Sequence, residues 1–154
     1  MAKDVLKRLH LTKFRQGSYF HVLSDNGILL KDVDMDAQFA TVVEKIRSKC
    51  EVCLLGACVL AKARVLDEIT CGDVLYDAGN RANHYWMETD EYGQLKDVFG
   101  YEQCQLMEVC FERNWGYGGY TSQFKTDRDL VRAVMTNLIH NGGVFILPDE
   151  EGDE

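Results

Sequence analysis

The sequence predicts an α+β fold: a mostly α-helical single domain with a β-hairpin and a short C-terminal strand. Three observations indicate this class. Apolar residues recur at helical spacing in several segments, most clearly over 130–139. An Asn-Gly pair at 26–27 separates two short apolar runs, which is typical of a hairpin. A continuous apolar run at 144–147 follows two glycines and precedes Pro148, which predicts a short buried strand.

The first third of the chain contains a predicted basic helix and the predicted hairpin. Segment 3–13 has the pattern of an amphipathic helix whose polar side is rich in Lys and Arg. That polar side indicates either a solvated surface or a contact with an acidic partner. The apolar runs 19–23 and 28–30 predict two strands joined through 24–27. The apolar face of the basic helix comprises Val5, Leu6 and Leu9.

Two further helices are predicted in the middle of the chain. Asp34 or Asp36 can cap a helix over 37–48, and the segment 52–65 is apolar on nearly all sides. Such all-round apolar character indicates a central buried helix. The inward face of the earlier helix comprises Phe39, Val42, Val43 and Ile46.

The last third contains the most strongly signalled helix of the chain. Before that helix, the pattern of 101–114 predicts another helix, whose inward residues are Cys104, Met107, Cys110 and Phe111. After it, Thr126 can act as an N-cap, while Asp127 and Asp129 place negative charge at the positive end of the helix dipole. Gly142 and its neighbours supply a left-handed exit. The apolar face of this final helix comprises Leu130, Val131, Val134, Met135, Leu138 and Ile139.

Length and charge limit the possible roles of the protein. The 154 residues fit one globular domain at 1–148, of which roughly 70% of the unfolded surface can be buried. The net charge is −8, and five of the acids lie in a flexible tail at 149–154, which leaves −3 for the body. Direct nucleic-acid binding is disfavoured, because it requires concentrated Lys and Arg. We expect a cytoplasmic protein without a membrane span, because neither a signal-peptide core nor about 20 consecutive apolar residues occur.

Six cysteines stand at 50, 53, 58, 71, 104 and 110, an even number that could form disulfides. Several lie on apolar helix faces and no signal peptide is apparent, so we expect free buried thiols instead. The spacing Cys50-x-x-Cys53 suits a metal or redox site, with Cys58, Cys71 and His84 as further ligands. A redox pair is expected where a strand leads into a helix, whereas the residues before Cys50 indicate a helix. We therefore expect no metal and no cofactor.

Two irregular segments carry the residues expected to bind a partner. The segments 80–92 and 115–120 combine aromatic side chains with glycines and lie outside the periodic helices. Trp, Tyr and Arg supply most of the binding energy of protein interfaces. The candidate partner-binding residues are Arg81, Tyr85, Trp86, Trp115 and Tyr117. The alternative for 115–120 is a loop whose rings fold back onto the core.

Three fragments resemble small uncharacterised proteins of bacteriophages and bacterial mobile elements. The fragment 53–58 is similar to the start of a cysteine-leucine-glycine helix in those proteins. The fragment 99–103 with 106–112 resembles a later helix of the same proteins, and the fragment 134–145 resembles their closing segment. The resemblance implies a phage-like accessory protein. It implies no activity, because the family has none to transfer.

These observations favour a non-catalytic protein that binds another macromolecule, with a protein as the expected partner. An inhibitor of a host defence complex, for example of CRISPR type, is one concrete form of this hypothesis. The alternative is a metal-binding protein, or a cysteine- or histidine-dependent enzyme, that uses the 71–91 region with Cys50 and Cys53. His84 is the histidine best placed for such a site, which would also contain Arg81, Glu88 and Asp90. The oligomeric state and the identity of the partner stay open.

Overall fold

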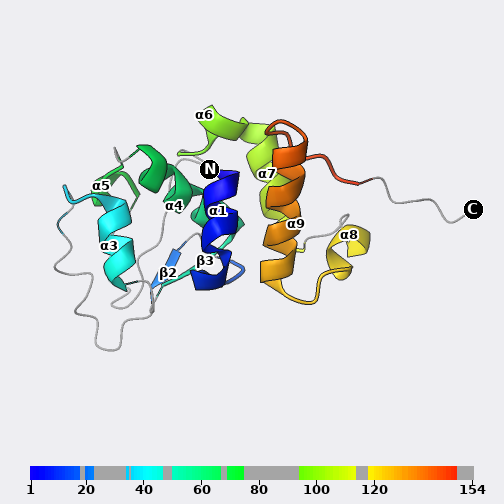
Figure 1. The fold of residues 1–154 in the computed structure, drawn as a ribbon, viewed down its shortest axis with the longest axis horizontal. Helices are drawn as coiled ribbons and strands as arrows, with labels where there is room; N and C mark the ends of the chain where they lie inside the picture. Colours follow the sequence, from blue (N-terminus) through cyan, green and yellow to red (C-terminus); the bar gives the residue numbers. More distant parts are fainter. Residues whose placement is uncertain are drawn as a thin grey trace, which may run out of the picture.

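The computed structural model describes residues 1–17, 20–22, 34, 36–46, 50–66, 69–74, 94–113 and 118–148, with the backbone alone at 20–22, 46, 50, 74 and 118. Helix α1 lies between α3 on one side and α9 on the other (Figure 1). The elements are α1 (Ala2–Arg8), η1 (Leu9–Leu11), β1 (Lys13–Phe14), β2 (Phe20–Val22), α3 (Phe39–Ile46), β3 (Cys50–Val52), α4 (Leu54–Leu66), α5 (Cys71–Val74), α6 (Lys96–Phe99), α7 (Tyr101–Phe111), α8 (Gly118–Ser122) and α9 (Asp127–His140).

The described part of the chain is mostly helical with a small sheet, which confirms the predicted α+β class. Its strands form one sheet in the order β1-β3-β2, with β1 parallel and β2 antiparallel to the central strand β3. Phe14 and Phe20 both pair with Val52, from opposite sides. Strand β2 coincides with the first arm of the predicted hairpin. The turn at 24–27 and the second arm at 28–30 lie outside the described residues.

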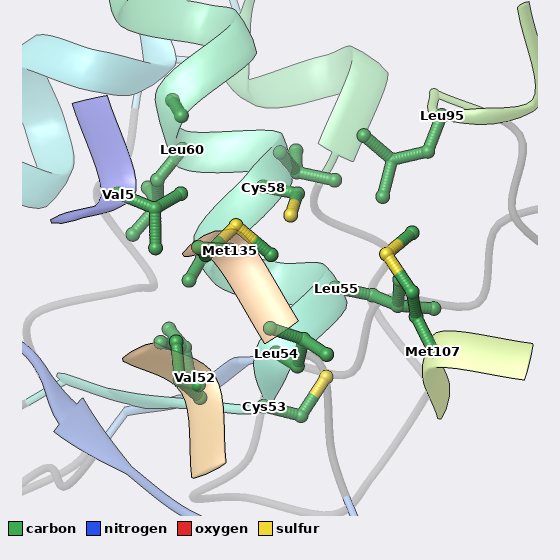
Figure 2. Packing of buried hydrophobic residues seen from close by; sticks show 14 of the residues in the cluster. Val5, Val52, Cys53, Leu54, Leu55, Cys58, Leu60, Leu95, Met107 and Met135 are labelled. Carbon is green, nitrogen blue, oxygen red and sulfur yellow. The ribbon is translucent and has the colours of Figure 1, made fainter. Parts of the chain in front are cut away.

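Helix α4 is the centre of the core, as its all-round apolar sequence predicts. Leu54, Leu55 and Cys58 have no exposed surface, and nine of its thirteen residues are buried. Figure 2 shows side chains from α1, α7 and α9 packed around this helix, with Val5, Met107 and Met135 among them. Segments that are distant in sequence therefore share one hydrophobic cluster.

Helix α9 begins, packs and ends as its sequence predicts. The Thr126 hydroxyl oxygen accepts a hydrogen bond from the Asp129 amide at 3.2 Å, which is an N-cap. At the other end Gly142 and Gly143 have φ angles of +65° and +101°, and the Gly143 amide donates to the Leu138 carbonyl at 2.7 Å. The residues buried against the core are Leu130, Val131, Val134, Met135 and Leu138.

The predicted N-terminal helix is shorter than expected, and the next helix starts differently. Helix α1 ends at Arg8, and residues 13–14 form a strand because they pair with β3 instead of extending the helix. The Phe39 amide at the start of α3 donates to the Ile69 carbonyl at 2.9 Å. Neither Asp34 nor Asp36 stands at the N-cap position, because α3 begins at Phe39, and the Asp34 carboxylate accepts from the amide of Asp36 at 3.0 Å.

The predicted C-terminal strand is wrong. Residues 144–148 are extended but join no sheet, because side-chain amides occupy the backbone groups that a strand would offer to a neighbour. Asn137 accepts from the Ile146 amide at 2.9 Å and donates to the Ile146 carbonyl at 2.6 Å. Gln103 accepts from the Phe145 amide at 2.8 Å. We call these three hydrogen bonds the amide clamp.

Helix α7 confirms the predicted helix at 101–114, with Cys104, Met107, Cys110 and Phe111 all buried. The length and hydropathy needed to cross a bilayer are not met by any helix in the described ranges.

Candidate functional site

The five predicted partner-binding residues lie outside the part of the chain that the structure describes. Arg81, Tyr85 and Trp86 fall within 75–93, and Trp115 and Tyr117 fall within 114–117. His84 and the acidic tail also lie outside the described ranges. Their role in binding therefore stays a prediction, and the surfaces described below come from other residues.

The end of the second predicted binding segment is not a flexible loop. Residues Gly118–Ser122 form helix α8, and Tyr120 is only 8% exposed. Its ring packs edge-on against Phe124 at a centroid distance of 5.2 Å and lies 6.3 Å from Phe145. Burial raises the pKa of the Tyr120 hydroxyl to about 12. Tyr120 is therefore a core aromatic, as in the alternative interpretation of this segment.

The Cys50-x-x-Cys53 spacing lies where a strand leads into a helix, which corrects the expectation of a preceding helix. Cys50 is the first residue of β3, and Cys53 directly precedes α4. The Cys53 sulfur accepts a hydrogen bond from the Gly56 amide at 3.4 Å. Even so, burial raises the pKa of the Cys53 thiol to about 12, so at neutral pH it is protonated.

The other described thiols are equally unsuited to nucleophilic chemistry. Burial raises the pKa of Cys58 strongly, raises that of Cys71, and raises those of Cys104 and Cys110 to about 11. The five cysteines whose side chains the structure describes are free and buried, as the sequence predicts. Within the described ranges no group of three or more His, Cys, Asp or Glu side chains is arranged to hold a metal ion.

Exposed apolar side chains lie on three neighbouring segments: α6, the start of α7 and the segment after α9. Val98, Tyr101, Val144 and Ile146 are 44%, 49%, 48% and 53% exposed. We call these four residues the end face. Beside them is an open hollow of about 390 Å³, whose lining residues are Met1, Ala2, Lys3, Val98, Phe99, Leu138, Ile139 and Gly143.

The amide clamp explains why apolar side chains of the end face are exposed to solvent. Successive side chains of an extended segment point to opposite sides. Phe145 is buried at 1% exposure, so Val144 and Ile146 on either side of it point outward. The sequence gives no sign of this, because all four residues of 144–147 are apolar and no polar residue marks the exposed positions.

A second surface, a groove between α1, α3 and α4, carries charge. Arg8, Glu44 and Arg64 line it, together with Lys45 at its edge. Arg8 donates from Nη1 to Glu44 at 2.7 Å, and Arg64 pairs with Asp4 at 2.8 Å. We call this feature the arginine groove. The sequence shows the basic α1 helix, but only the fold brings Lys45 and Arg64 to its side.

The chain matches no protein-family model, no curated protein and no solved structure.

Proposed function

We propose that the protein acts without catalysis by binding another protein, as an accessory protein of phage or mobile-element type. The observation that supports this proposal most directly is the end face. Val98, Tyr101, Val144 and Ile146 are four of the seven large apolar residues that are strongly exposed in the described ranges. Apolar residues gathered on one part of a surface are characteristic of an interaction site.

The chemistry of the cysteines supports binding over catalysis. A cysteine nucleophile must be reachable and at least partly ionised at neutral pH. The described thiols are buried, and their pKa values are all raised. The alternative, an enzyme or metal protein that uses Cys50, Cys53 and the 71–91 region, predicts one zinc per purified chain. Metal analysis by mass spectrometry tests it directly.

The resemblance of 53–58, 99–112 and 134–145 to phage and mobile-element proteins supports the biological setting. In that setting, the protein partner is a component of a host defence complex, for example of CRISPR type. Such inhibition requires binding alone.

Affinity capture from a bacterial lysate with an end-face variant as control tests the proposal. The double variant Val98→Ser with Ile146→Ser removes two exposed apolar side chains without opening the core. We expect a partner that immobilised wild-type protein retains and the double variant loses. The matched control is Val65→Ser, because Val65 is an equally apolar residue, 58% exposed, at the end of α4.

Identical recovery with wild-type protein and the double variant would show that the end face does not bind. Loss with Val65→Ser as well would indicate a general effect of surface hydrophobicity. Thermal unfolding of all three proteins guards against a loss of structure, which substitutions at exposed positions rarely cause.

The aromatic residues outside the described ranges have a separate test. Interface aromatics contribute roughly 2 kcal/mol or more on truncation. We expect at least one of Trp86→Ala and Trp115→Ala to weaken partner binding tenfold or more, about 1.4 kcal/mol. The melting temperature should hardly change. Large losses of stability in both variants, roughly 3–5 kcal/mol, would instead make both rings core residues.

A further inference from the structure

Charge is strongly segregated along this acidic chain. Residues 1–15 contain five Lys and Arg and one Asp, a net charge of +4. Since the whole chain carries −8, the remaining residues carry −12. The fold gathers further cations beside this N-terminal segment, because Lys45 and Arg64 line the arginine groove together with Arg8.

The arginine groove is an open depression of about 650 Å³ on the surface between α1, α3 and α4. Its lining residues are Arg8, Ala40, Thr41, Glu44, Lys45 and Arg64. Arg64 is only 15% exposed, and its Nε and Nη2 both contact the same Asp4 oxygen at 2.8 Å. Asp4 therefore fixes the position of Arg64 at the base of the groove.

The groove has more hydrogen-bond donors than its own acceptors satisfy. A guanidinium has five N–H donors. Arg8 uses one of them, on Nη1, for a hydrogen bond within the described part of the protein. Its Nε is buried and lies 3.8 Å from Asp4, too far for a hydrogen bond. Lys45 pairs with no carboxylate of the described residues, whereas Asp4 and Glu44 are both engaged.

An apolar hollow of about 30 Å³ adjoins the arginine groove and shares Arg8, Glu44 and Arg64 with it. Val43, Val52 and Leu60 form its walls, and Leu11 lies at its edge with 37% of its surface exposed. The volume admits one small apolar group. Unsatisfied cationic donors thus lie next to a small apolar recess.

We propose that the arginine groove binds an acidic segment of a partner protein. Carboxylates of that segment pair with Arg8 and Lys45, and a small apolar side chain between them enters the hollow. Glu44 occupies Arg8 in the free protein and is displaced by an incoming carboxylate. This inference rests on the proposed function and gives the partner its chemistry.

A protein segment fits this surface better than a nucleic acid does. A continuous phosphate backbone would meet the carboxylate of Glu44 in the groove. Phosphates also gain nothing from an apolar recess. Discrete carboxylates separated by an apolar side chain suit both the cations and the hollow.

Fluorescence anisotropy with a short fluorescein-labelled peptide of alternating glutamate and valine tests the proposal. We expect saturable binding to the full-length protein that weakens with salt, because the contacts are ionic. Lys45→Glu should weaken binding about tenfold or more, which corresponds to about 1.4 kcal/mol. Glu44→Gln should tighten it about threefold, because the competing carboxylate is removed. A purely structural role of Glu44 would give no such gain.

The matched control is Arg132→Glu, which reverses an exposed charge on the outer face of α9 and should leave peptide binding unchanged. Three results would overturn the inference: no saturable binding up to about 1 mM peptide, equal weakening by Arg132→Glu, or tighter binding of duplex DNA than of the peptide. If the peptide does not bind but a partner is captured through the end face, only the inference about the arginine groove is wrong. If the peptide binds but no partner is captured through the end face, the proposed function of the end face is wrong.

Discussion

Helices α4 and α9 both belong to the core, but they contribute to it differently. Nine consecutive or nearly consecutive residues of α4 are buried, whereas the buried residues of α9 form one stripe. The polar side chains of α4 lie in its last turns and serve the fold. Lys62 donates to the Gln94 carbonyl at 2.6 Å, and Arg64 pairs with Asp4. On α9, Arg132 and His140 face solvent.

This difference decides what a substitution can report. A change on the first two turns of α4 alters packing whichever residue is chosen. On α9, positions three or four residues apart report packing, and the positions between them report surface properties. Stability and binding can therefore be separated on α9 and not on most of α4.

The largest expected effect compares a buried leucine on each helix. Leu55 and Leu138 are 0% and 1% exposed, and each →Ala substitution should cost about 2–5 kcal/mol of the free energy of unfolding. Urea unfolding measures both. An unchanged midpoint for Leu138→Ala would show that α9 does not face the core. Ile139→Ala, one position further along, is the matched control and should cost less, because Ile139 is only partly buried.

The next effect comes from buried cysteines, of which α9 contains none: two belong to α4 and its N-cap, and Cys71, Cys104 and Cys110 lie elsewhere in the core and act in the same direction. The pKa of Cys53 is raised from 9.0 to about 12, and that of Cys58 is raised further. As the pH rises, these thiols therefore lose their protons at a lower pH in the unfolded chain than in the folded protein. The contribution of these thiols to the free energy of unfolding is fully present below pH 9. Above pH 9 it falls by about 1.4 kcal/mol per pH unit for each of these two thiols.

Urea unfolding at several pH values between 8 and about 10.5 measures this loss. A Cys58→Ala variant is the control, and its stability should fall less steeply with pH even if it is lower throughout. A stability that is independent of pH in this range would contradict the burial of both thiols.

A smaller effect is expected at the N-terminus of α9. Thr126→Ala removes the hydroxyl that accepts from the Asp129 amide, and N-cap losses of this kind cost about 1 kcal/mol. Thr126→Ser keeps the hydroxyl and should restore most of the stability. If the alanine and serine variants melt at the same temperature, the cap contributes nothing.

The smallest effect is expected on the outer face of α9. Arg132 is 55% exposed and pairs with Asp129, one helical turn away, at 2.8 Å. Arg132→Ala should change the free energy of unfolding by less than about 0.5 kcal/mol. A loss as large as that of Leu138→Ala would mean that both faces of α9 are structural, and the contrast with α4 would disappear.

The sequence predicts the parts of this fold that depend on local periodicity and caps. Helices α4, α7 and α9 are recognisable because their apolar spacing extends over several turns, and Thr126 and Gly142 mark the ends of α9. The parallel pairing of β1 with β3 was not predictable, because strands of two and three residues are too short to show a period.

The surfaces were less predictable than the helices. The basic character of α1 is visible in the sequence, but its meeting with Lys45 and Arg64 depends on contacts between distant segments. The end face was not predictable from the sequence, because the run 144–147 is apolar throughout. A run of four apolar residues indicates a buried strand, and two side-chain amides from α7 and α9 determine which of the four are exposed.

The amide clamp also fixes the course of the last described segment of the chain. It anchors Ile146 to α9, while Met1 lines the same hollow as Gly143. The first residue and the last described segment thus emerge on the same side, beside the end face. A short linker could join them in a circular permutant. An affinity tag on the N-terminus would begin next to the proposed binding surface, so capture experiments need attachment through an exposed residue elsewhere, such as Lys125.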